Sequence, residues 1–85
     1  MNADEMLNEA ARIVSDRRVV YGDPKSSMAA IAARWSVTLG TPVSAAQVVL
    51  CLIDLKLARL THDPAHEDSI LDVAGYAAVL REVTR

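Results

Sequence analysis

Two acidic side chains stand four residues apart near the end of the sequence, at Asp68 and Asp72. In a helix this spacing places both carboxylates on one face, where they repel each other. Magnesium readily offsets such a pair, because it prefers carboxylate oxygen and also binds substrate phosphates. Asp68 alone would equally suit a helix N-terminus, whereas Asp72 lies beyond the first turn. The pair therefore predicts a magnesium site with Asp68 and Asp72 as ligands.

Three further charged residues interrupt a strongly apolar segment, at Asp54, Lys56 and Arg59. An unpaired buried carboxylate is costly, so Asp54 should meet a base, a metal ion or water, and it is a possible third magnesium ligand. Lys56 and Arg59 could bind phosphate, Arg59 through its bidentate guanidinium and Lys56 as a point charge. The same two residues equally fit a salt-bridged pair at a subunit boundary.

Other familiar catalytic signatures are absent from the sequence. There is no glycine-rich phosphate loop, no Cys-x-x-Cys pair and no nucleophile elbow. Aromatic residues are scarce, so Tyr76, one turn beyond Asp72, and Tyr21, beside Gly22, attract interest. The single Cys51 excludes an internal disulfide, and its apolar neighbours predict a small core residue.

Four helices must position these side chains, and we expect them at residues 4–18, 24–39, 45–60 and 67–83 of a single all-α domain. Asp23 and Ser44 are predicted N-caps, Pro24 suits a first helical position, and Gly40 is a stop signal. The segment 45–60 is apolar nearly all round, which predicts a helix in the middle of the molecule. Short connections make an antiparallel four-helix bundle the expected fold.

The composition limits the kinds of partner. Of 85 residues, 52% are apolar, which is more than a domain of this size can bury and predicts a homo-oligomer. The net charge of −2, without a basic cluster, argues against binding to a DNA or RNA duplex. Neither a signal peptide nor an apolar stretch of membrane-spanning length is visible, so we expect no membrane partner and a cytoplasmic protein.

Several of these motifs together resemble a known family. The chain looks like a family of small phage and prophage proteins, which is similar to the MazG-like all-α nucleoside triphosphate pyrophosphohydrolases. The resemblance covers about residues 7–80 and rests on Arg17 or Arg18 with Tyr21-Gly22-Asp23-Pro24, Ile31-Ala32-Ala33-Arg34-Trp35-Ser36, Lys56-Leu57-Ala58-Arg59 and His66-Glu67-Asp68-Ser69-Ile70-Leu71-Asp72-Val73-Ala74-Gly75-Tyr76.

This resemblance implies a MazG-like helical bundle that assembles as a dimer or as a tetramer made of two dimers. Mg²⁺ and a nucleoside triphosphate would be held between its helices. Cleavage of an NTP or dNTP would give a nucleoside monophosphate and pyrophosphate. Asp72 would close the second acidic motif, and Asp68 would replace a glutamate that is Ser69 here. Asp68 and Asp72 are then the catalytic candidates. Arg17 or Arg18 would join Lys56 and Arg59 on phosphate, and Tyr21 and Tyr76 would contact base or sugar.

The sequence departs from that enzyme pattern at one important place. The first acidic motif of the superfamily has no match, because Asp54 is the only acid on the third predicted helix. Two alternatives to an enzyme therefore stay open. The chain could be a non-catalytic phage protein that sequesters a nucleotide signal, or one that binds a host protein through its apolar surface.

Overall fold

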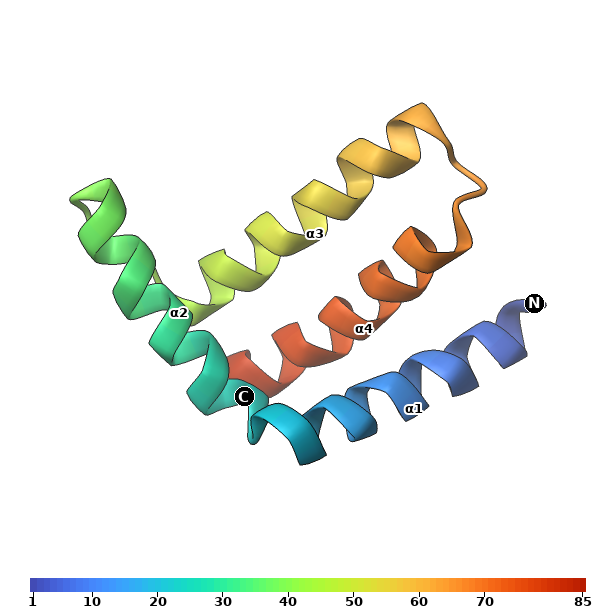
Figure 1. Cartoon of the computed structure of the whole chain (residues 1–85), viewed down its shortest axis with the longest axis horizontal. Coiled ribbons are helices and arrows are strands. Elements are labelled where there is room, and N and C mark those ends of the chain that lie inside the picture. Colours follow the sequence, from blue (N-terminus) through green and yellow to red (C-terminus); the bar gives the residue numbers. More distant parts are fainter.

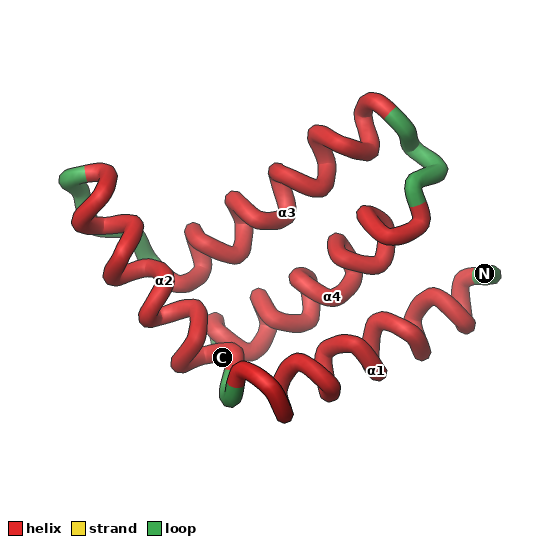
Figure 2. The backbone as a smooth tube through the Cα atoms, viewed as in Figure 1, coloured by secondary structure: helices red, strands yellow, loops and turns green.

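A computed structural model describes all residues, Met1–Arg85, as four α-helices without a β-strand. Short turns and loops connect the helices (Figures 1 and 2). The all-α fold predicted from the sequence is thus confirmed. The helices are α1 (Ala3–Tyr21), α2 (Pro24–Leu39), α3 (Ala45–His62) and α4 (Glu67–Thr84).

Side-chain caps explain where the helices begin. Asn2 and Glu5 form a reciprocal capping box at the start of α1, and Ser44 and Gln47 form another at the start of α3. The predicted Asp23 cap is confirmed, since its carboxylate accepts a hydrogen bond from the Lys25 backbone N–H at 3.1 Å. At α4 the cap is an imidazole, because His66 Nδ1 accepts from the backbone N–H of Ser69 at 3.3 Å.

The first helix is longer than the sequence pattern predicts. It continues through Val19 and Val20 to Tyr21, and Gly22 then caps it with φ +82° and ψ −164°. β-Branched residues lower helix propensity only slightly, so they do not stop a helix by themselves. The stop comes from Gly22, whose backbone conformation is open almost only to glycine. This extension places Tyr21 on α1 rather than in a loop.

The helices do not form the expected antiparallel bundle. Figure 1 shows α3 antiparallel to α4, whereas α1 runs in the same direction as α4, and α2 crosses near the ends of the other helices. The turn at Gly22 and Pro24 explains the difference, because it directs α2 away from α1 instead of back along it. α4 contacts all three other helices, while α3 does not contact α1. The central helix is therefore α4, and the expectation for α3 was wrong.

The molecule is a thin plate with a small core. Its extents are 41 × 30 × 21 Å, and only seven of 85 residues are buried. Val48 and Val49 of α3 and Ser69 and Leu71 of α4 belong to this buried set, whereas Cys51 is exposed, contrary to the prediction from its neighbours. None of the helices combines the length and the apolar character needed to cross a bilayer.

Candidate functional site

A groove of about 540 Å³ lies where α1, α2 and α4 meet, and we call it the α1–α2–α4 groove. One residue of α3 contributes to its lining as well. Its walls are largely apolar, which suits the body of a small organic ligand. The lining residues are Ile13, Val14, Arg17, Arg18, Tyr21, Gly22, Pro24, Ser27, Met28, Ile31, Leu52, Leu71, Asp72, Gly75, Tyr76 and Val79.

Five of the residues singled out in the sequence converge on this groove. They come from the last turns of α1 and from the middle of α4, and they are Arg17, Arg18, Tyr21, Asp72 and Tyr76. On α1, spacings of three and four residues hold the arginines and the tyrosine near one side of the helix. On α4, the spacing of four places Tyr76 one turn beyond Asp72. Helical periodicity thus explains both halves of the cluster.

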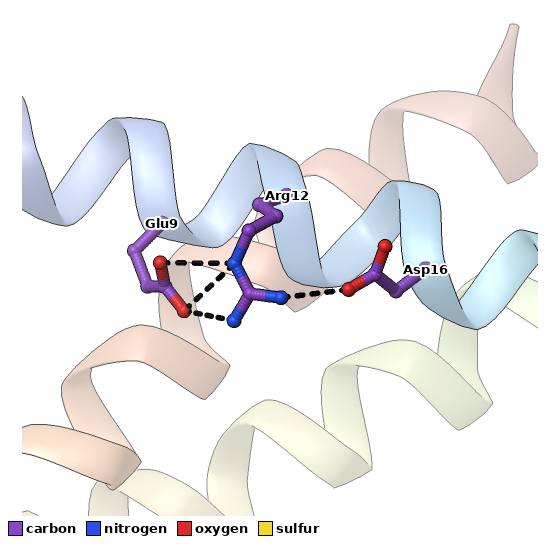
Figure 3. A network of polar contacts seen from close by, with 3 residues as sticks. All are labelled: Glu9, Arg12 and Asp16. Carbon is purple, nitrogen blue, oxygen red and sulfur yellow. Dashed lines mark hydrogen bonds and ion pairs between the residues drawn. The ribbon is translucent and has the colours of Figure 1, made fainter.

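The two groove arginines have no acidic partner within the chain, unlike another arginine of the same helix. Figure 3 shows Arg12 between Glu9 and Asp16, hydrogen-bonded to Asp16 at 2.7 Å and to both oxygens of Glu9. The hydrogen bond from Arg12 lowers the pKa of Glu9, and the same bond raises the pKa of Arg12. None of the ion pairs in the structure includes Arg17 or Arg18, so their charges are available to a ligand.

Asp72 is not a free carboxylate. Its Oδ2 lies 3.1 Å from Lys56 Nζ, and the side chains are only 20% and 14% exposed. Lys56 reaches α4 because it follows Leu52 by one turn on the side of α3 that packs inward. The predicted partnership of Lys56 with Arg59 is not formed, since Lys56 pairs with Asp72 on the inner side of α3. Arg59 is exposed and does not line the groove.

The three predicted magnesium ligands do not converge within one chain. Asp54 and Asp68 are exposed and lie outside the groove, and Asp72 pairs with Lys56. Asp54 lies on the outer side of α3, and Asp68 belongs to the first turn of α4, where the helix dipole favours an acid. No three His, Cys, Asp or Glu side chains are placed to share a metal ion. The residues of a single chain therefore do not fit a magnesium site.

Sequence reasoning missed the Lys56–Asp72 ion pair and the apolar groove wall. A signal for the ion pair was present, because Lys56 and Asp72 lie eight residues before and after Pro64 in the connecting loop. In an antiparallel helix pair, residues at equal distances from the turn lie opposite each other. The wall built from Val14, Met28 and similar residues carried no such signal, because apolar stripes of this kind are usual for core packing.

The groove favours an anion with an apolar or aromatic body. Arg17 and Arg18 contribute two positive charges, and the single negative charge in the lining, on Asp72, is offset by Lys56. Guanidinium groups bind phosphate or carboxylate oxygens through paired hydrogen bonds. Tyr21 and Tyr76 add aromatic surface to the same groove. The arrangement can bind and orient a ligand, and the one serine in the lining, Ser27, donates its hydroxyl to the Tyr21 carbonyl oxygen at 3.1 Å.

Comparisons with known proteins identify relatives among phages. A family model described as "Domain of unknown function (DUF6378)" matches residues 5–84. The Gene 55 protein of Mycobacterium phage L5 is 34% identical over 80 residues, covering 92% of this chain and 51% of the relative. The Gene 55 protein of Mycobacterium phage D29 is 32% identical over 82 residues, covering 95% and 54%. The chain thus spans about half the length of these relatives. No solved structure matches it.

Proposed function

This chain belongs to the DUF6378 family, with relatives among phage proteins, and we propose that its α1–α2–α4 groove binds a nucleotide without cleaving it. The observation that carries the proposal is the presence of two unpaired arginines, Arg17 and Arg18, beside two tyrosines in one apolar groove. The phosphates would bind the arginines, and the base or sugar would contact Tyr21 and Tyr76. A nucleotide ligand agrees with the cytoplasmic location expected from the sequence.

The size and polarity of the groove support this ligand class. Its volume of about 540 Å³ lies within the range of roughly 300–1,000 Å³ typical of small-molecule sites. A nucleotide combines a flat, weakly polar base with a strongly charged phosphate group. The groove offers the matching combination of an apolar wall, aromatic side chains and cations.

The ion pair between Asp72 and Lys56 favours binding over hydrolysis. A MazG-like pyrophosphohydrolase would use Asp68 and Asp72 with magnesium, yet Asp72 is engaged by Lys56 and Asp68 lies outside the groove. We therefore propose sequestration of the nucleotide by the single chain. Pyrophosphohydrolase activity would need further acidic residues near Asp72, from a second chain or from another protein.

The first test is nucleotide binding by variants of the groove. Isothermal titration with ribo- and deoxyribonucleoside triphosphates should give saturable binding. The variant Arg17→Ala/Arg18→Ala should weaken it at least about tenfold, because two charge-assisted phosphate contacts are lost. The matched control is Arg34→Ala, which removes an exposed arginine of α2 that does not line the groove. Equal affinity in both variants would show that the groove is not the binding site.

The second test separates binding from catalysis. After incubation with Mg²⁺, the nucleotide should be recovered intact, and no pyrophosphate should be released. If pyrophosphate is released by the wild type but not by Asp72→Asn, and the helical content of the variant is unchanged, the chain is a pyrophosphohydrolase instead. Absence of any nucleotide binding, together with capture of a host protein by the intact chain, would support the host-binding alternative.

A further inference from the structure

A second apolar surface lies at the corner where α2 leads into α3, and we call it the corner surface. It surrounds a hollow of about 470 Å³ and shares no lining residue with the α1–α2–α4 groove. The polar side chains in its lining, Thr41 and Gln47, carry no charge. Its apolar side chains are Trp35, Leu39, Pro42, Val43, Leu50 and Cys51.

Beyond the corner surface, the outer side of α3 carries exposed leucines with one exposed carboxylate, Asp54, between them. Leu50 is 48% exposed, and Leu57, seven residues further on the same side, is 46% exposed. α3 lies at the edge of the plate, where it packs only against α2 and α4 (Figure 1). The outer side of this apolar helix therefore has no partner within the chain. Exposed leucines beside an uncharged hollow are a feature that protein interfaces share.

The amount of exposed surface fits one additional partner. A folded monomer of 9.2 kDa is expected to expose about 4,900 Å². This chain exposes 5731 Å², an excess of roughly 800 Å², which is about one partner's share of a standard protein interface. The radius of gyration agrees, since it is 13.5 Å where about 12 Å is expected for a compact chain of this length.

We propose that the corner surface joins two copies of this chain in a two-fold dimer. A two-fold interface opposes a surface to itself, so it is favourable only where the surface carries no excess of one charge. The corner surface meets this condition, because its lining contains no charged residue. The surface around the exposed Val19 and Val20 at the end of α1 does not meet this condition. Pairing of that surface with itself would bring the positive charges of Arg17 and Arg18 of both copies together.

The hollow also gives the dimer a specific contact. It lies next to exposed leucines, so a two-fold arrangement can seat a leucine of each copy in the hollow of the other. This contact is independent of the proposed nucleotide site, because the two surfaces share no residue. Loss of the dimer should leave the lining of the groove unchanged.

Sedimentation equilibrium of the intact chain should show a dimer with twice the chain mass of 9.2 kDa. Leu39→Glu and Leu50→Glu should each weaken dimerisation at least about tenfold, because a carboxylate would be buried at the interface. The control is Leu7→Glu on α1, because Leu7 and Leu39 are both 63% exposed. Circular dichroism identifies any variant that fails to fold. Leu39 lies at the end of α2, where the fold tolerates a charge more readily than at Leu50, so Leu39→Glu keeps the test valid if Leu50→Glu does not fold.

Crosslinking tests the same contact without a disruptive substitution. Cys51 is the only cysteine, it is exposed, and it lines the corner surface. A short bismaleimide should therefore join two copies in the wild type and none in Cys51→Ser. A chain that stays monomeric at all concentrations would overturn the proposal. A dimer that survives both Leu39→Glu and Leu50→Glu would overturn it as well. The same holds for a dimer that is lost in Leu7→Glu, or for one that cannot be crosslinked through Cys51.

Discussion

Among single residues, Lys56 and Asp72 have the largest influence on how the candidate site is interpreted. Each would be a charged group in a mostly buried position if the other were absent, since their side chains are 14% and 20% exposed. Breaking such a pair leaves an uncompensated charge, whereas replacing both partners by apolar residues removes that penalty. The pair thus links α3 to α4 and also supplies the only acidic residue of the groove lining.

A double-mutant cycle measures this interaction. Lys56→Met and Asp72→Leu should each lower the free energy of unfolding. The loss in the double variant should be smaller than the sum of the two single losses by about 1–3 kcal/mol. Urea unfolding at one fixed protein concentration gives the four free energies of unfolding, for the wild type, the two single variants and the double variant. Simple additivity of the two single changes would mean that the ion pair contributes nothing to the fold.

The other charged residues of the site differ from this pair in having no partner. Arg17 and Arg18 form no ion pair, although Arg12, one and a half turns earlier, is held by Glu9 and Asp16. Ion pairing along α1 therefore ends at Asp16, just before the two groove arginines. This contrast is the reason that the proposed anion site is assigned to Arg17 and Arg18.

At the scale of the helices, two glycines that line the groove have opposite roles. Gly22 ends α1 at φ +82°, a conformation that an L side chain adopts only with strain. Gly75 lies inside α4 with an ordinary helical backbone, and a Cβ there would be 3.7 Å from Val14 Cγ2, a normal packing distance. The first glycine is required by the turn, and the second is merely tolerated by the helix.

The same substitution should consequently have opposite effects at these two positions. Gly22→Ala should lower the free energy of unfolding by about 1–3 kcal/mol through backbone strain. Gly75→Ala should raise it by about 0.5–1 kcal/mol through higher helix propensity. Thermal and urea denaturation of both variants provide the measurement. A destabilised Gly75→Ala would show that α1 packs more closely on α4 than the Val14 distance indicates.

At the scale of the whole molecule, the plate shape connects the fold to both proposals. A layer 21 Å thick buries few side chains, so much of the apolar composition stays exposed. The α1–α2–α4 groove and the corner surface are two separate consequences of this thinness. One is lined by cations and aromatic residues, and the other is uncharged, which suits them to different partners.

If the proposed dimer forms, the stability of the chain must depend on its concentration. Any partner that binds only the folded state stabilises that state by mass action. The midpoint of thermal unfolding should therefore rise with protein concentration for the wild type and for Leu7→Glu. For Leu39→Glu the midpoint should rise less over the same range of concentrations, because its dimer is weaker. A constant midpoint for the wild type at concentrations above and below the measured dissociation constant would contradict the dimer.

The sequence by itself determined the four helices and where they begin, because helix starts depend on nearby residues. The Ser44 cap and the stop at Gly40 depend on contacts within a few positions of the chain, and both were predicted from the sequence. The end of α1 was misplaced because the β-branched Val19 and Val20 were given too much weight against Gly22. The relationship to phage proteins was likewise visible in short motifs.

Only the tertiary structure decided which side chains meet. The direction that α2 takes after Gly22 places α1 parallel to α4, so Arg17 and Tyr21 share a groove with Asp72 and Tyr76. The same packing turns Asp54, Asp68 and Arg59 outward and leaves Cys51 exposed. Helix periodicity fixes which residues share a face, but the partner of that face depends on crossing angles and connections that involve the whole chain.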